Sequence, residues 1–202
     1  MQSIDRVHER FVYGRRVSQL VHHLSSMIPE GPGRVLDVGC GDGLLSSRLH
    51  ARRPELAIEG IDVLVRPHTH IAVRRFDGIR VPHPDQSFDI VMLIDVLHHT
   101  EDPGILLLEA SRVARRAVIV KDHRREGVLA GQVLRFMDWV GNARHGVALP
   151  YNYPSDSQWQ EHFQFAQLHI ADQTRALHLY PAWADWLFGR GLHLLVRLEH
   201  RA

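Results

Sequence analysis

The chain has 202 residues, of which 45% are apolar and 23% charged, and these are ordinary values for one globular domain with a sizeable core. The formal net charge of +1 provides no broad positive field, so nucleic acid is not an expected partner. One cysteine, Cys40, excludes an internal disulfide. A single cysteine fits a reducing compartment, so we expect a cytoplasmic protein. No apolar run approaches the ~18 residues of a membrane span, and residues 1–6 lack a signal-peptide pattern.

Ile4 to Ile28 is predicted to form an amphipathic helix. Its apolar residues recur at spacings of three, four and seven, as one helix face requires. Gly14 interrupts this pattern and predicts a break near Tyr13. The proline and glycine residues of 29–33 end the helix.

A glycine-rich turn follows the first predicted strand, Arg34 to Val38. Gly39, Gly41 and Gly43 stand where the chain must turn sharply into a helix from Leu44 to about Arg52. Glycine permits a positive φ and a close approach of a ligand to the backbone, and the helix start offers unpaired N–H groups. Cys40 lies within this turn, where a small side chain is needed, so we interpret it as structural.

A second strand, Ala57 to Asp62, ends in an acid roughly 20 residues after the turn, where a doubly wound sheet places a carboxylate for ribose hydroxyls. The glycine spacing is G-x-G-x-G and not the G-x-G-x-x-G of dinucleotide-binding proteins. Turn and acid together predict a nucleoside-cofactor site. The alternative is a tight strand-to-helix turn without a ligand.

The next segments alternate between strands and loops or helices. Pro67 disfavours a crossover helix after the second strand, so residues 63–70 are expected to form a loop. His68 and His70 have no acid or cysteine nearby in sequence, and we predict no metal there. The expected elements that follow are strands at Ile71 to Phe76, Phe88 to Ile94 and Ala117 to Lys121, with a helix at Gly104 to Ala114 before the last of these.

The C-terminal part contains a long aromatic and polar segment, residues 124–154, which is longer than a plain connector needs. We expect a short helix and a lid over a pocket, or a helical packing element. A capped helix from Ser155 to about Ala166 and strands at Thr174 to Tyr180 and His193 to Glu199 complete the chain. Trp183 and Trp186 are expected to pack against the sheet or to rim the substrate entrance.

The glycine turn, the acid Asp62, the pair Asp77-Gly78 and the stretch from Asp95 to Pro103 with its two histidines occur in the order found in class I S-adenosylmethionine (SAM)-dependent methyltransferases. The chain resembles their type 11 group, which acts on small molecules. The resemblance implies an α/β fold with a doubly wound, Rossmann-like, seven-stranded sheet. The sheet would be mostly parallel with an antiparallel last strand and helices on both faces. Residues 1–202 would form one domain, with residues 1–30 as an N-terminal helical cap.

The resemblance also implies SAM as the cofactor. Asp62 would accept the ribose hydroxyls and Asp77 the adenine amino group, although Asp77 also suits an Asx turn closed by Gly78. Tyr13 and Arg15 would face the methionine end, or lie in solvent. The expected cofactor-binding residues are Asp37, Gly39, Cys40, Gly41, Gly43, Asp62, Val63, Asp77, Gly78, Asp95, Val96 and Tyr13.

The implied reaction is a direct displacement in which an O, N, C or S atom of a small-molecule acceptor attacks the methyl group. His123, oriented by Asp122, is the first candidate for a general base and His99 the second, and either can instead be a substrate contact. The rival classes are a non-catalytic SAM-binding or regulatory subunit and a nicotinamide-dependent dehydrogenase, which the glycine spacing disfavours. Methylation of nucleic acid is a weaker alternative. We expect a monomer or a homodimer.

Overall fold

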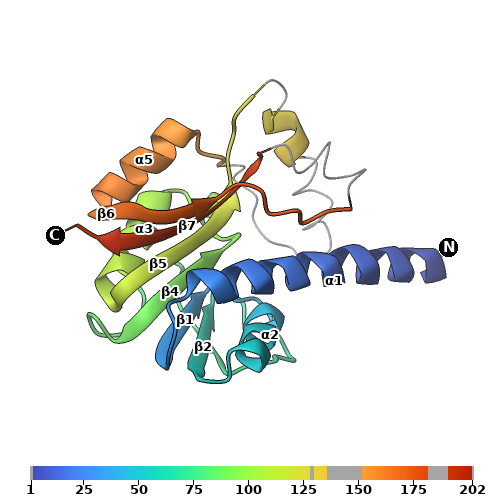
Figure 1. Cartoon of the computed structure of the whole chain (residues 1–202), viewed down its shortest axis with the longest axis horizontal. Coiled ribbons are helices and arrows are strands. Elements are labelled where there is room, and N and C mark those ends of the chain that lie inside the picture. Colours follow the sequence, from blue (N-terminus) through green and yellow to red (C-terminus); the bar gives the residue numbers. More distant parts are fainter. Residues whose placement is uncertain (1, 128–129, 136–151, 182–190, 202) are drawn as a thin grey trace.

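The computed structural model describes residues 2–127, 130–135, 152–181 and 191–201, with side chains from residue 14 onward (Figure 1). Of the predicted lid-like segment, residues 124–154, the parts at 128–129 and 136–151 lie outside the described residues, as do the two tryptophans at 183 and 186. The elements, in chain order, are α1 (Gln2–Met27), β1 (Gly33–Val38), α2 (Leu44–Arg52), β2 (Leu56–Asp62), β3 (Val73–Arg75), β4 (Phe88–Ile94), the 3-10 helix η1 (Leu97–His99), α3 (Pro103–Val113), β5 (Ala114–His123), α5 (Asp156–Phe165), β6 (Leu168–Thr174) and β7 (His193–His200). Residues 130–135 are also helical.

The seven strands form one sheet in the order β3-β2-β1-β4-β5-β7-β6. β1 pairs in parallel with β2 on one side and with β4 on the other, while β7 lies antiparallel between β5 and β6. This arrangement confirms the predicted fold class, including the antiparallel last strand. Because the strand order reverses between β1 and β4, a crevice for a ligand is expected at their carboxyl ends.

Helices cover both faces of the sheet, and this explains why its central strands are apolar at successive positions (Figure 1). On one face, Val35 and Ile90 pack with residues of α1 and α2, and on the other, Leu36 and Val91 pack with residues of α3 and α5. None of the described helices has the length and apolar character that a membrane span requires.

The predicted break in the first helix is wrong, because α1 runs from Gln2 to Met27 without interruption at Gly14. A glycine inside a helix costs only about 1 kcal/mol relative to alanine. The C-terminal half of α1 buries Leu20, Leu24 and Met27 against the sheet. This burial outweighs the weak propensity of one glycine.

The predicted sixth strand is also wrong in position, since β6 spans Leu168–Thr174 and residues 175–179 form no strand. Gln167 takes a positive φ of 58°, so the chain turns directly from α5 into β6. The alternating Leu177 and Leu179 are buried, but they pack beside α1, where the Leu177 carbonyl contacts His23 Nε2 at 3.2 Å. Their alternation therefore reflects one buried side of an extended segment and not a strand.

Both edge strands of the sheet are short or irregular. The third strand is only Val73–Arg75, shorter than predicted, and the loop expected in place of a crossover helix at residues 63–70 is present. At the other edge, the pairing of β6 with β7 shifts register between Ile170 and Asp172. The remaining predicted helices and strands lie at or within a few residues of their expected positions.

Candidate functional site

The glycine turn after β1 brings open backbone to the point where the strand order reverses. Gly39, Gly41 and Gly43 have φ values of 73°, 60° and 75°, which favour glycine. A Cβ on Gly39 would lie 2.5 Å from Val96 Cγ2, and a Cβ on Gly43 would lie 2.4 Å from a side-chain atom of Ile71. A Cβ on Gly41 would meet nothing within 4 Å. The backbone of Gly41 therefore faces free space that a ligand can enter.

Asp62, at the end of β2, points back to this turn. Its Oδ2 accepts a hydrogen bond from Gly41 N at 2.8 Å, and its Oδ1 accepts one from Leu64 N at 2.8 Å. Each carboxylate oxygen has a further lone pair available. The half-buried carboxylate is thus fixed in position and can accept two more hydrogen bonds.

Apolar side chains lie exposed in the loops that follow β2 and β3. Val63 is 51% exposed after β2, and Ile79 is 63% exposed after β3. Gly78 has a φ of 84° and approaches Val63 closely, since an added Cβ would be 3.1 Å from Val63 Cγ1. Exposed apolar residues at this crevice are suited to the faces of a flat ring.

Asp77 forms the Asx turn that was the alternative to an adenine contact. Its Oδ1 accepts hydrogen bonds from Ile79 N at 2.8 Å and Arg80 N at 2.7 Å. These two backbone donors hold the pKa of Asp77 below its ordinary value. The turn does not use Oδ2, so the role of Asp77 at an adenine ring stays a prediction.

A cavity of about 180 Å³ lies beneath α1 at the carboxyl ends of β1 and β4. Its lining combines apolar side chains with one cation and two carboxylates, and consists of Arg16, Val17, Leu20, Asp37, Gly39, Cys40, Leu45, Ile94 and Asp95. Four of these residues, Asp37, Gly39, Cys40 and Asp95, were predicted to bind the cofactor. The sequence interpretation missed the cation, because α1 directs Arg16 and not Arg15 to this place.

Asp37 and Cys40 are the titratable groups on the β1 side of the cavity. Burial raises the pKa of Asp37 to about 7, although Ser46 Oγ donates a hydrogen bond to its Oδ2 at 2.6 Å. Burial and the charges of Asp37 and Asp62 raise the pKa of the Cys40 thiol. The thiol also packs against Gly60, where an added Cβ would be 2.5 Å from Sγ. Cys40 is therefore a packed thiol and not a reactive one.

Asp95 lies between two cations at the end of β4. It pairs with Lys121 Nζ from the end of β5 and, at 2.5 Å, with Arg16 Nη2 from α1. Burial opposes its ionisation, but Lys121 and Arg16 together hold the pKa of Asp95 well below its ordinary value. Asp95 also has a positive φ of 58°, which is uncommon for a residue other than glycine and is typical of functional sites. The Tyr13 side chain lies outside the described residues.

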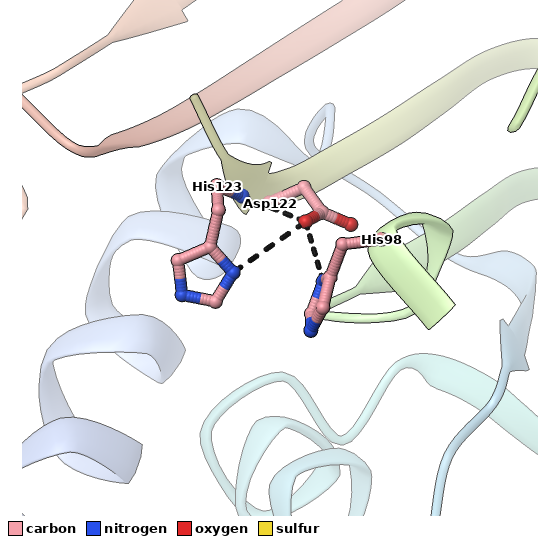
Figure 2. A group of neighbouring side chains, drawn as sticks. All are labelled: His98, Asp122 and His123. Atoms are coloured by element: carbon pink, nitrogen blue, oxygen red, sulfur yellow. Dashed lines mark hydrogen bonds and ion pairs between the residues drawn. The ribbon is translucent and has the colours of Figure 1, made fainter. Parts of the chain in front are cut away.

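Next to this triad, a cluster of imidazoles surrounds Asp122, the fully buried penultimate residue of β5 (Figure 2). Asp122 Oδ1 accepts hydrogen bonds from His98 Nδ1 at 2.6 Å and from the His123 backbone N at 2.7 Å, and Oδ2 accepts one from Leu97 N at 2.9 Å. The His123 ring is less closely held, with Nδ1 3.7 Å from Asp122 Oδ1. Asp122 thus orients His98 more directly than the predicted His123.

The predicted bases occupy different positions in this cluster. His123 is 4% exposed, and burial lowers its pKa. The ring of His99 lies 4.0 Å from that of His98, between centroids. His193, at the start of β7, lies 5.0 Å from His123 by the same measure and was not predicted. Strands β4, β5 and β7 bring these residues together across more than 90 positions of sequence, which no local pattern reveals.

A doubly wound sheet with a glycine turn after β1, a carboxylate after β2 and ionisable groups after β4 and β5 defines a class I methyltransferase fold. The chain belongs to the methyltransferase-domain family, because the model of that family, described as "Methyltransferase domain", matches residues 7–181. The resemblance found in the sequence is thereby confirmed, and the family implies SAM as the cofactor.

Individual relatives agree with this assignment. The chain is 43% identical over 86 residues to an uncharacterized methyltransferase of Mycobacterium tuberculosis. This alignment covers 39% of the chain and 44% of the relative. It is 30% identical over 112 residues to the 27-O-demethylrifamycin SV methyltransferase of Amycolatopsis mediterranei, and this alignment covers 48% of the chain and 41% of the relative. The chain therefore spans less than half the length of each of these relatives. The Haloferax volcanii chain solved with the Trm112 methyltransferase activator shares the fold, with a TM-score of 0.69, 17% identity and coverage of 99% and 95%.

The described residues fit this cofactor. Free space above Gly41 lets a ribose approach the backbone, and the fixed Asp62 carboxylate retains acceptor capacity for hydroxyls. The cavity of about 180 Å³ is smaller than the roughly 300–1,000 Å³ of a pocket for a whole ligand. It can hold the methionine end alone, and the adenosyl end would then lie along Gly41, Asp62 and Val63.

Proposed function

We propose that this protein transfers a methyl group from SAM to a small-molecule acceptor. The observation that carries the proposal is the contact of Asp62 with Gly41 beside open backbone, at the point where the strand order reverses. The chain is similar to the 27-O-demethylrifamycin SV methyltransferase, whose name gives a small molecule as its substrate. This similarity supports a small-molecule acceptor.

Each part of the site has a matching part of the cofactor. Asp62 accepts the ribose hydroxyls, Val63 and Ile79 contact the adenine faces, and Asp77 accepts from the adenine amino group. In the cavity, Arg16 suits the carboxylate of the methionine end, and Asp37 or Asp95 suits its ammonium. When bound, SAM supplies a methyl group activated by a positively charged sulfur.

The acceptor belongs on the side of the imidazole cluster. His98 is the middle residue of η1, and His123 is the last residue of β5. Both lie next to the triad of Arg16, Asp95 and Lys121, which borders the cavity. A neutral imidazole held by a carboxylate can take the proton of an acceptor hydroxyl or amine. We propose that Asp122 positions the cluster and that His123 or His99 contacts the acceptor, as the sequence predicts.

The rival functions have less support. A nicotinamide-dependent dehydrogenase is not supported by membership of the methyltransferase-domain family. A non-catalytic SAM-binding subunit with the same fold is not favoured by the ionisable groups placed beside the cavity. A cytoplasmic location and a monomeric or homodimeric state remain predictions from the sequence.

Two measurements test the proposal. Calorimetry should show that the full chain binds SAM and S-adenosylhomocysteine, while NAD gives no heat of binding. Incubation with methyl-labelled SAM and a mixture of small hydroxylated and amino compounds should then give a labelled product. A chain that binds neither adenosyl compound contradicts the proposal, and binding without any product across a wide acceptor set favours the regulatory alternative.

A further inference from the structure

The imidazole cluster has the composition of a metal site. His98, Asp122 and His123 each offer one potential ligand atom, and these atoms lie within 4.8 Å of one another (Figure 2). All three residues are buried, and they come from η1 and the end of β5. Two imidazoles and one carboxylate form a donor set that first-row divalent metals prefer.

The separations are close to those around a bound ion. Two ligands at 2.0–2.1 Å from one ion lie roughly 3 Å apart. The measured separations from Asp122 Oδ1 are 2.6 Å to His98 Nδ1 and 3.7 Å to His123 Nδ1, which lie on either side of that value. The third pair, His98 and His123, is separated by no more than 4.8 Å. Shifts of up to about 1 Å would therefore bring the three atoms around one ion.

Hydrogen bonding within the described residues leaves part of the cluster unexplained. Nδ1 of His123 is buried and has no hydrogen-bond partner, and it points toward Asp122 Oδ1 across a gap too long for a hydrogen bond (Figure 2). Both ring nitrogens of the neighbouring His193 are likewise buried without a partner. Buried polar atoms in native proteins nearly always have a partner, which includes bound ions.

We propose that His98, Asp122 and His123 bind one divalent transition-metal ion of the Zn²⁺ or Fe²⁺ type. Three protein ligands leave at least one coordination position open, as in catalytic metal sites. This inference rests on the proposed function for its consequence: the open position takes a hydroxyl oxygen of the methyl acceptor. The ion favours the ionised form of that hydroxyl, and its proton passes to the imidazole of His99. The oxygen keeps the electron pair and attacks the methyl carbon, while the bond from this carbon to the sulfonium sulfur breaks and S-adenosylhomocysteine leaves. The acceptor class is then an alcohol or phenol, and O is the methylated atom.

Direct metal binding provides the test. The full chain, stripped with a chelator and desalted, is titrated with ZnCl₂ and separately with CoCl₂. We expect one ion per chain by mass spectrometry and, for Co²⁺, a visible absorption band whose position reports the geometry. X-ray absorption at the zinc edge of the unmodified chain should show two imidazoles among N and O ligands. Less than about one ion per five chains, or a bound ion without imidazole ligands, overturns the proposal.

Variants locate the ion. Asp122→Asn and His123→Gln keep the approximate side-chain shapes and should raise the Kd for Co²⁺ at least about tenfold. His169→Ala, a change of an exposed histidine on β6, should leave the Kd unchanged. If both cluster variants are folded by circular dichroism and bind Co²⁺ as the unmodified chain does, the ion lies elsewhere and the proposal is wrong.

The outcomes for metal and for methyl transfer are separable. S-adenosylhomocysteine binding does not require the ion and should persist after chelation. Methyl transfer that is unaffected by chelator in a chain without metal overturns this inference and leaves the proposed function intact. A chain that binds one ion at the cluster but no adenosyl compound retains the metal site and loses the methyltransferase function.

Discussion

In the proposed complex, Asp62 is the single residue on which cofactor binding most depends. Replacing it with alanine removes the acceptor of Gly41 N and Leu64 N and, in the proposed complex, both hydrogen bonds to the ribose. Hydrogen bonds to a charged group contribute about 1.5–3 kcal/mol each, so S-adenosylhomocysteine should bind at least about 100-fold more weakly. Calorimetry measures this loss. Asp85→Ala changes an exposed acid that pairs with Arg112 and serves as the control; equal affinities for the two variants would contradict the role of Asp62.

Asp37 should make the stability of the protein depend on pH. Its pKa is about 7 in the folded chain and about 3.8 as an ordinary carboxyl, so folding disfavours its charged form. The contribution of Asp37 to the free energy of unfolding is therefore largest at low pH. It decreases as pH rises above the ordinary pKa of about 3.8 and is constant above the folded-state pKa of about 7. Between pH 5 and pH 8 this group should lower the free energy of unfolding by about 2–3 kcal/mol.

Urea denaturation of the unmodified chain and of Asp37→Asn at both pH values measures the effect. The variant cannot ionise at this position, so its free energy of unfolding should fall less between pH 5 and pH 8. An identical fall in both proteins would show that Asp37 is already charged at pH 5 in the folded state.

Candidate site residues were predictable from the sequence where each lies directly at the end of a predicted strand. The glycine turn and Asp62 are each next to a strand end, and strand pairing alone brings them together. His98 was missed because the choice between two adjacent histidines depends on η1, whose single turn directs His98 toward Asp122, 24 residues later. Arg16 was missed because a shift of one residue on α1 changes the direction of a side chain by about 100°.

Among the elements, α5 begins with a capping box that was predictable from its sequence. Ser155 Oγ accepts from Gln158 N at 3.3 Å, and Gln158 Oε1 accepts from Ser155 N at 2.9 Å. Ser155→Ala should lower the free energy of unfolding by about 1 kcal/mol and Tm by roughly 2–4 °C. Scanning calorimetry measures the shift, with the exposed mid-helix change Gln160→Ala as the control. A Tm drop no larger than that of the control would mean that the cap contributes nothing.

The boundaries that were missed belong to elements whose partners are distant. The alternation of Leu177 and Leu179 predicts a strand, but the neighbour that buries them is α1, more than 150 residues earlier. β6 instead follows α5 after two turn residues and pairs with β7. Periodicity identifies which side of a segment is buried and does not identify what covers it.

At the scale of the whole molecule, α1 is part of the core and not only a cap. Leu20, Leu24, Met27 and Ile28 are each no more than 4% exposed and pack on the sheet face that borders the cavity. Deleting residues 1–30 should remove at least about 6 kcal/mol of apolar burial, comparable with the entire stability of a domain. Deleting only residues 1–13 retains these four side chains and is the control.

The comparison is made by thermal unfolding followed with circular dichroism. We expect a cooperative transition for the shorter deletion and none for the longer one. A cooperative transition of the longer deletion near the Tm of the full chain would show that α1 is dispensable for folding.

The short β3 and the displaced register of β6 have a consequence for how molecules of this protein meet. The unpaired backbone N–H and C=O groups of a long, regular edge strand can pair with a strand of another polypeptide and extend the sheet. Here the edge strand β3 has only three residues, and the edge strand β6 has a register shift between Ile170 and Asp172, so neither is a regular template for pairing. Concentrated preparations should therefore resist growth into fibres, and any pairing of two molecules is expected to use helical surfaces.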